Sequence, residues 1–100
     1  MTTLQVLKDA RALIFNGWTR NSYYRMVFGR HTYCAMGAIN KAACLDARSY
    51  VGHWEAEVTL KNILEYRGLN RSVTKFNDDA TSKQEVLDLF DEAIARLEQV

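Results

Sequence analysis

Apolar residues recur at helical spacing at both ends of the chain. From Leu4 they form one stripe that ends at Gly17, and threonines just before the stripe can cap the helix. Near the C-terminus, Ser82 and Glu85 have the spacing of a capping box. The apolar positions that follow lie on one helical face: Val86, Phe90, Ala93, Ile94 and Leu97. The pattern therefore predicts a helix at each end of the chain.

Two more helices are predicted between these ends. The first runs from about Thr32 or Tyr33 to Cys44. It consists largely of alanine and glycine, so neighbouring elements can pack close to its backbone at the centre of the domain. The second runs from about Ser49 to Tyr66, where a glycine follows and ends it.

Two stretches, Tyr23–Phe28 and Ser72–Phe76, are rich in aromatic and β-branched residues and predict short extended elements. No proline, repeat or linker divides the chain. We therefore expect a mostly α fold, with residues 1–100 forming a single domain of about four helices and a minor short β or extended element. The predicted core is Leu7, Ile14, Trp18, Cys34, Ile39, Trp54, Val58, Ile63, Phe76, Val86, Phe90, Ile94 and Leu97.

Length and composition favour a soluble globular protein. The 100 residues are 48% apolar and 25% charged, which is ordinary for a compact domain. No apolar run approaches the roughly 20 residues that cross a bilayer, and the N-terminal stretch lacks the pattern of a signal peptide. Two cysteines without an export signal point to reduced thiols. These features predict a cytoplasmic location.

The net charge of +1 hides an uneven distribution. Residues 1–50 carry seven Lys and Arg against two Asp, whereas residues 51–100 carry six against ten Asp and Glu. One interpretation is a basic face and an acidic face, which would favour self-association or a charged partner. The other is that the two halves interleave in the fold and their charges cancel.

Cys34 is a candidate nucleophile because it opens a predicted helix, where the helix dipole and free N–H groups favour a thiolate. His31 or His53 could act as the base, and Asn77 or Asp78 could orient that base. With His53 as the base, the order Cys, His, Asn/Asp resembles papain-like cysteine hydrolases, but the similarity stops at the order. The alternative is a buried thiol that packs as a small hydrophobic group among the alanines.

The histidines and cysteines do not have metal-site spacing. Cys34 and Cys44 are ten residues apart, and neither short-spaced pair of a structural zinc site is present. The sequence therefore predicts no metal and no cofactor.

A basic, aromatic stretch in the N-terminal half is a candidate for nucleic-acid binding. Arg20, Arg25 and Arg30 would neutralise phosphates, and Tyr23 and Tyr24 would stack on bases. The overall pI of about 7.8 is low for such a protein, so nucleic acid is not the expected partner. The alternative is that these aromatics enter the core while the arginines are solvated or paired with the acidic half.

Two segments, YCAMGAINKAA and FNDDATSKQEVLDLFDEAIARL, are similar to the paired signatures of a small uncharacterised family found in actinobacteria and bacteriophages. In the first segment the matching residues are Cys34, Ala35, Gly37, Ala38 and Ile39. In the second they are Phe76, Asn77, Asp78, Thr81, Glu85, Val86, Leu87, Leu89, Phe90, Asp91, Ala93 and Ile94. The pairing suggests that the Cys34 helix start lies beside Asn77 and Asp78, with one of them bonded to backbone there.

The resemblance implies a compact helical intracellular protein, encoded by a phage and acting in the host cytoplasm. It brings no established activity. Small phage proteins without catalytic signatures often bind host proteins, so the favoured hypothesis is a non-enzymatic accessory protein that acts through protein contacts, with a host protein or as a homodimer. A Cys34-dependent hydrolase or transferase and a weak nucleic-acid binder remain open as alternatives.

Overall fold

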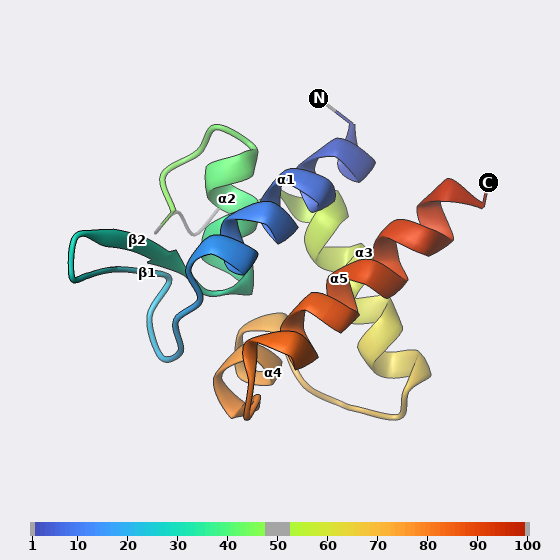
Figure 1. The fold of residues 1–100 in the computed structure, drawn as a ribbon. Coiled ribbons are helices and arrows are strands. Elements are labelled where there is room, and N and C mark those ends of the chain that lie inside the picture. The colour runs from blue at the N-terminus through green and yellow to red at the C-terminus, as the bar shows by residue number, and fades with distance from the viewer. Residues whose placement is uncertain (1, 48–52, 100) are drawn as a thin grey trace.

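In the computed structural model, residues 2–47 and 53–99 are described (Figure 1). This part of the chain forms five helices and one antiparallel hairpin. In chain order the elements are α1 (Thr3–Asn16), β1 (Tyr24–Val27), β2 (Arg30–Tyr33), α2 (Ala35–Ala42), α3 (Trp54–Tyr66), α4 (Val73–Asp79) and α5 (Lys83–Glu98). The predicted mostly α fold with a minor β element is confirmed.

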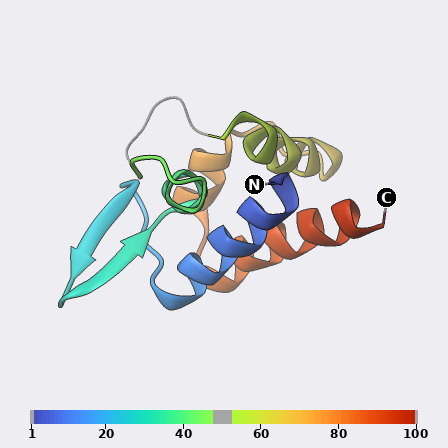
Figure 2. The ribbon, with the colours of Figure 1, turned by 90° about the horizontal axis from the view of Figure 1, so that it is seen from above.

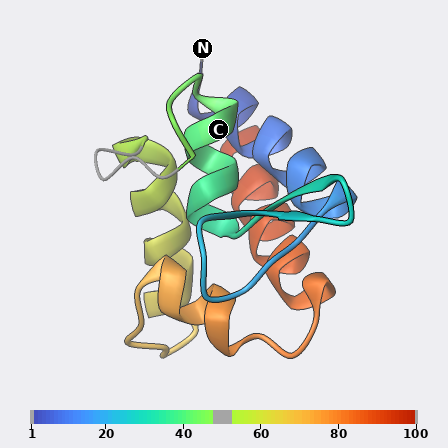
Figure 3. The ribbon, with the colours of Figure 1, turned by 90° about the vertical axis from the view of Figure 1, so that its left-hand side faces the viewer.

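The first and last helices pack side by side along the body, and α2 packs against another side of α1 (Figure 1). α3 contacts α5 and α1, while α4 lies beside α2 (Figure 3). The largest completely buried side chains come mainly from α1, α2, α3 and α5 and include Phe90, Leu7, Ile14, Ile39 and Leu60. The hairpin projects from one side of this helical body (Figure 2).

The helix starts are set by local hydrogen bonds. The Thr2 side chain accepts the N–H of Gln5 at 3.1 Å and begins α1. At α5, the Glu85 carboxylate accepts the Ser82 N–H at 3.2 Å, as a capping box requires. None of the helices in the described part of the chain combines the length and apolar character of a membrane span.

The extended element predicted at Ser72–Phe76 is wrong, because this stretch begins helix α4. The Ser72 hydroxyl caps the helix by accepting the N–H of Lys75 at 3.1 Å. Val73 and Asn77, four residues apart, are both buried on the inward face. The described residues therefore contain five helices rather than the expected four.

The extended element predicted at Tyr23–Phe28 is confirmed as β1, but it continues into a second strand. Thr32 and Tyr33 belong to that strand, β2, so the predicted helix start at these residues is wrong. α2 begins only at Ala35 and ends at Ala42. The start predicted near Ser49 for the next helix lies outside the described residues; within them, α3 begins at Trp54.

Seven of the predicted core residues are buried: Leu7, Ile14, Cys34, Ile39, Ile63, Val86 and Phe90. Trp18, Phe76, Ile94 and Leu97 are partly buried and pack against that core, while Val58 is half-buried. The prediction for Trp54 is wrong, since its side chain is 71% exposed. The inward face of α3 is set by Ala56, and Trp54 lies about 200° around the helix from it, because each residue turns about 100°.

Candidate functional site

Cys34 lies at the start of α2, as predicted, but it is closed off from solvent. Its side chain is 1% exposed, and its Sγ accepts the N–H of Gly37 at 3.4 Å. Burial raises the pKa of the Cys34 thiol, and this effect outweighs the backbone N–H groups that favour the thiolate. The interpretation of Cys34 as a buried thiol at a helix start is therefore confirmed.

The two candidate bases, His31 and His53, form hydrogen bonds with groups other than Cys34. His31 lies on β2, where its Nδ1 is 2.6 Å from the hydroxyl oxygen of Tyr24. His53 caps α3 by accepting the N–H of Ala56 on its Nδ1 at 3.3 Å. Within residues 2–47 and 53–99, neither histidine hydrogen-bonds to Cys34. The predicted pair of a Cys34 thiol and a histidine base is therefore not formed among these residues.

Asn77 joins α4 to two distant parts of the chain. Its Oδ1 accepts the N–H of Ala35 at 3.0 Å and the indole N–H of Trp18 at 2.9 Å. Its Nδ2 donates to the carbonyl of Thr19 at 3.1 Å. The predicted placement of Asn77 beside the Cys34 helix start is confirmed. Its side chain bonds to two backbone groups, the Trp18 indole and the carboxylate of Asp78, and to no histidine, so its role here is structural.

Asp78 holds the same segment from the next position of α4. Its Oδ1 accepts the N–H of Asn21 at 2.7 Å and the Nδ2 of Asn77 at 3.2 Å. Asn21 has a φ of 64°, in the left-handed region that asparagine tolerates. Asp78 therefore fixes the turn that leads into the hairpin.

In the described residues, no group of three or more His, Cys, Asp and Glu side chains is arranged to hold a metal ion.

The hairpin turns through two residues, Phe28 and Gly29, between Val27 and Arg30. Phe28 has a φ of 50° and Gly29 a φ of 76°. Positive φ at both central residues is typical of a type I′ turn, which matches the twist of the strands. The Phe28 side chain is fully exposed at the tip. A bulky aromatic residue thus occupies a position that favours Asn, Asp or Gly.

The base of the hairpin is fixed to the body. The N–H of Tyr33 donates to the carbonyl of Gly17 at 2.9 Å, and the N–H of Thr19 donates to the carbonyl of Tyr33 at 3.1 Å. A Cβ on Gly17 would lie 2.3 Å from the carbonyl oxygen of His31. Only glycine permits this close approach between the end of α1 and β2.

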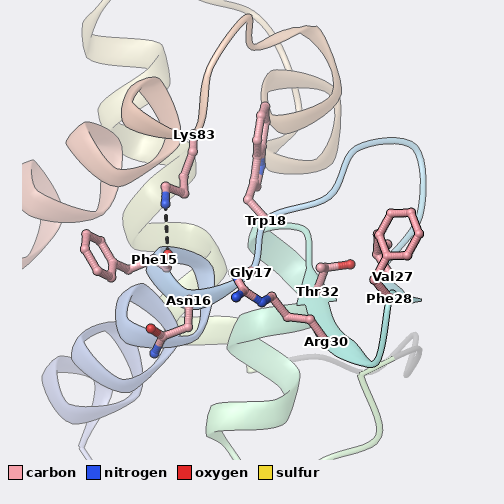
Figure 4. A pocket seen from close by; sticks show the side chains of 9 residues that line it. All are labelled: Phe15, Asn16, Gly17, Trp18, Val27, Phe28, Arg30, Thr32 and Lys83. Carbon is pink, nitrogen blue, oxygen red and sulfur yellow. Dashed lines mark hydrogen bonds between the residues drawn. The ribbon is translucent and has the colours of Figure 1, made fainter.

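An open pocket of about 530 Å³ lies between the hairpin and the end of α1 (Figure 4). Its lining is aromatic, aliphatic and basic: Phe15, Asn16, Gly17, Trp18, Val27, Phe28, Arg30, Thr32 and Lys83. Lys83 donates from its Nζ to the carbonyl of Phe15 at 2.9 Å and lies 4.7 Å from the centroid of the Phe15 ring. In Figure 4, Arg30 reaches from the hairpin toward Gly17.

Ion pairs join α1 to α5, whereas the arginines of the hairpin strands form none within the described residues. Basic residues of α1 pair with acidic residues of α5: Lys8 lies 3.1 Å from Glu98, and Arg11 pairs with Asp91. The interleaving of the two halves is therefore confirmed for these helices. Arg25 and Arg30 form no ion pair with any residue that the structure describes. The hairpin consequently retains positive charge.

Of the five residues predicted to bind nucleic acid, three are engaged in internal contacts. Arg20 donates to the carbonyl of Ala80 at 3.1 Å and lies over the Trp18 ring. Tyr24 bonds to His31, and Tyr23 is partly buried against the core. Arg25 and Arg30 are exposed on the strands.

Sequence reasoning missed Phe28, Phe15 and Lys83 as members of this surface. The signal for the hairpin is present in YRMVFGRHTY, where a residue followed by glycine separates two strand-like runs. Phe-Gly is not one of the usual turn pairs, so the sequence predicts only the first strand, and a helix start at Thr32 or Tyr33 in place of the second. Lys83 is brought to the pocket by tertiary packing alone.

Comparison with known proteins gives one relationship. No curated protein and no solved structure matches the chain. Residues 1–96 match the model of a family of unknown function, DUF6197. Since the match covers nearly the whole chain, the protein belongs to the DUF6197 family.

Proposed function

We propose that this protein is a non-enzymatic binding protein that acts through protein–protein contacts at the tip of its hairpin. The single observation that carries the proposal is Phe28, a large apolar side chain that is fully exposed on a projecting turn. Large exposed apolar groups beside basic residues are typical of contact surfaces.

Phe28 is unfavourable for the isolated protein in two ways. Its left-handed backbone costs about 1 kcal/mol for a bulky residue. Its ring gains no burial, so it makes no hydrophobic contribution to folding. Phe15 adds a second aromatic side chain, 56% exposed, on the adjoining wall of the pocket. A partner protein that covered these two rings would bury apolar surface that folding leaves exposed to solvent.

The burial and the raised pKa of the Cys34 thiol favour a binding protein over an enzyme. A nucleophilic thiol needs a thiolate and a base within hydrogen-bond reach, whereas this thiol is buried with a raised pKa. The resemblance to actinobacterial and phage sequences supports the finer proposal of a phage accessory protein in the host cytoplasm.

Affinity capture with matched baits tests the proposal. The baits are the wild-type protein, Phe28→Asn and Tyr66→Gln, each immobilised and exposed to bacterial lysate, with bound proteins identified by mass spectrometry. Asn suits the turn, so Phe28→Asn removes the ring without harming the fold. Tyr66→Gln removes another largely exposed aromatic ring, from α3 and away from the hairpin.

The proposal expects at least one protein to be retained by wild type and by Tyr66→Gln but lost from Phe28→Asn. Retention by all three baits would show that the hairpin tip is not the contact surface. Capture of no protein by wild type, together with a monomer in sedimentation analysis, would also overturn the proposal.

A further inference from the structure

We propose that the pocket between α1 and the hairpin receives an acidic segment of the partner protein, with a large apolar residue seated between Phe15 and Phe28. This inference rests on the proposed function and names the chemistry of the partner. The pocket supplies two kinds of contact at once, cationic side chains and exposed apolar walls.

The surface around the pocket is basic and lacks acidic residues. No Asp or Glu occurs from Ala10 to Leu45, so the part of α1 from Ala10 onward, the hairpin and α2 bring no acidic side chain. The pocket lining likewise contains no carboxylate. Arg30 lines it from the hairpin and Lys83 from the start of α5. Two cations facing a carboxylate-free pocket are complementary to an acidic segment.

The walls of the pocket carry exposed apolar side chains. Phe15, Val27 and Phe28 line the pocket and are all exposed. Lys83 lies over one face of the Phe15 ring, so cation and aromatic surface adjoin each other on the same wall. A peptide that alternates carboxylates with large apolar residues would satisfy both features within a short length.

Two aromatic rings of the segment predicted to bind nucleic acid, Trp18 and Tyr24, are engaged in contacts within the fold, which makes nucleic acid the less favoured ligand. Single-strand binding needs free ring faces on which bases stack. The Trp18 ring is covered by Arg20 at 5.8 Å, and its indole N–H is held by Asn77. Tyr24 packs against His31 and Tyr33 at centroid distances of 5.7 and 5.3 Å.

The ion pairs argue against a second copy of this chain as the acidic partner. On α5, Asp91 is paired with Arg11, and Glu98 with Lys8. Glu92 is held by both Arg67 and Arg96. These three carboxylates are already paired within their own fold, which makes them poor ligands for the pocket of a second copy.

Fluorescence anisotropy with labelled probes tests the inference. The first probe is a short peptide that alternates Asp or Glu with Leu, and its counterpart replaces every carboxylate with the matching amide. A single-stranded thymidine oligonucleotide is the third probe. The proteins are wild type, Arg30→Gln, Lys83→Gln and, as the matched loss of one positive charge outside the pocket, Lys75→Gln on α4.

The inference expects the acidic peptide to bind wild type and to bind Arg30→Gln and Lys83→Gln about fivefold more weakly each. Lys75→Gln should bind like wild type, and affinity should fall as salt rises. No binding of the acidic peptide, equal binding of the amide peptide, or tighter binding of the oligonucleotide would each overturn the inference. Formation of a stable dimer that Arg30→Gln dissociates would overturn it as well.

The two proposals fail separately. If Phe28-dependent capture from lysate persists while the acidic peptide does not bind, the choice of an acidic partner is wrong and the contact surface stands. If capture does not depend on Phe28, the contact surface itself is wrong.

Discussion

The side-chain oxygen of Asn77 accepts the backbone N–H of Ala35 at 3.0 Å, across 42 positions of sequence. The same oxygen accepts the indole N–H of Trp18. One buried amide therefore fixes the start of α2 and the segment that leads from α1 into the hairpin.

Replacing Asn77 with Ala should lower the free energy of unfolding by about 3 kcal/mol. The change leaves the N–H of Ala35 and the carbonyl of Thr19 buried without their partner. Urea unfolding followed by circular dichroism measures the loss. Asn62→Ala, at an exposed position of α3, is the control and should change stability by less than about 0.5 kcal/mol. Equal effects of the two changes would contradict the role of Asn77.

Phe28→Asn should raise the free energy of unfolding by about 0.5 to 1 kcal/mol. Asparagine adopts the left-handed conformation with little strain, and Asn-Gly is the preferred pair for this turn. Thermal unfolding measures the gain. Phe28→Ala removes the ring but keeps a Cβ residue at positive φ, so its stability should stay close to that of wild type. An Asn variant no more stable than the Ala variant would show that backbone strain is not the cause.

Gly37→Ala should destabilise the protein by about 3 kcal/mol. The added Cβ would lie 1.9 Å from the carbonyl oxygen of Tyr23, so the hairpin and α2 would have to separate. Gly68→Ala provides the comparison, because Gly68 has a φ of 80° and open space around it. It should cost only about 1 kcal/mol, from backbone conformation alone. A smaller loss at Gly37 than at Gly68 would contradict the close packing.

Cys34 should react with iodoacetamide far more slowly than Cys44 in the native protein. Burial blocks access to Cys34 and raises the pKa of its thiol, so less thiolate is present at pH 7. Cys44 is exposed. Raising the pH should increase labelling of Cys34 only modestly, since access stays closed, and urea should remove the difference. Mass spectrometry of the two labelled peptides measures both rates; equal native rates would exclude a closed thiol.

The terminal helices were predictable from sequence because their signals are local. The Ser82 and Glu85 spacing marks the start of α5, and its apolar face follows directly. α4 was missed because Val73 and Phe76 favour strands, while a cap at Ser72 and one buried face decide the outcome in a helix of only seven residues. The return strand β2 was missed because Phe-Gly is an unusual turn pair.

The candidate site was less predictable because tertiary packing creates it. Arg30 was singled out from its basic, aromatic surroundings, and it does line the pocket. Lys83 comes from α5, more than fifty residues after Arg30. The sequence alone identifies it only as a residue in the first turn of that helix. The thiol and histidine hypothesis depended on chain order, which carries no information about distance.

The pairing of Tyr33 with Gly17 has a kinetic consequence. Because these backbone bonds and those of Asn77 hold the base of the hairpin in place, the hairpin would need no ordering in the proposed binding to a partner protein. A flexible loop would lose conformational entropy on association, whereas this hairpin is already ordered when the chain folds. Encounter should therefore be limited by diffusion and orientation, and the lifetime of a complex by how well the two exposed rings are covered.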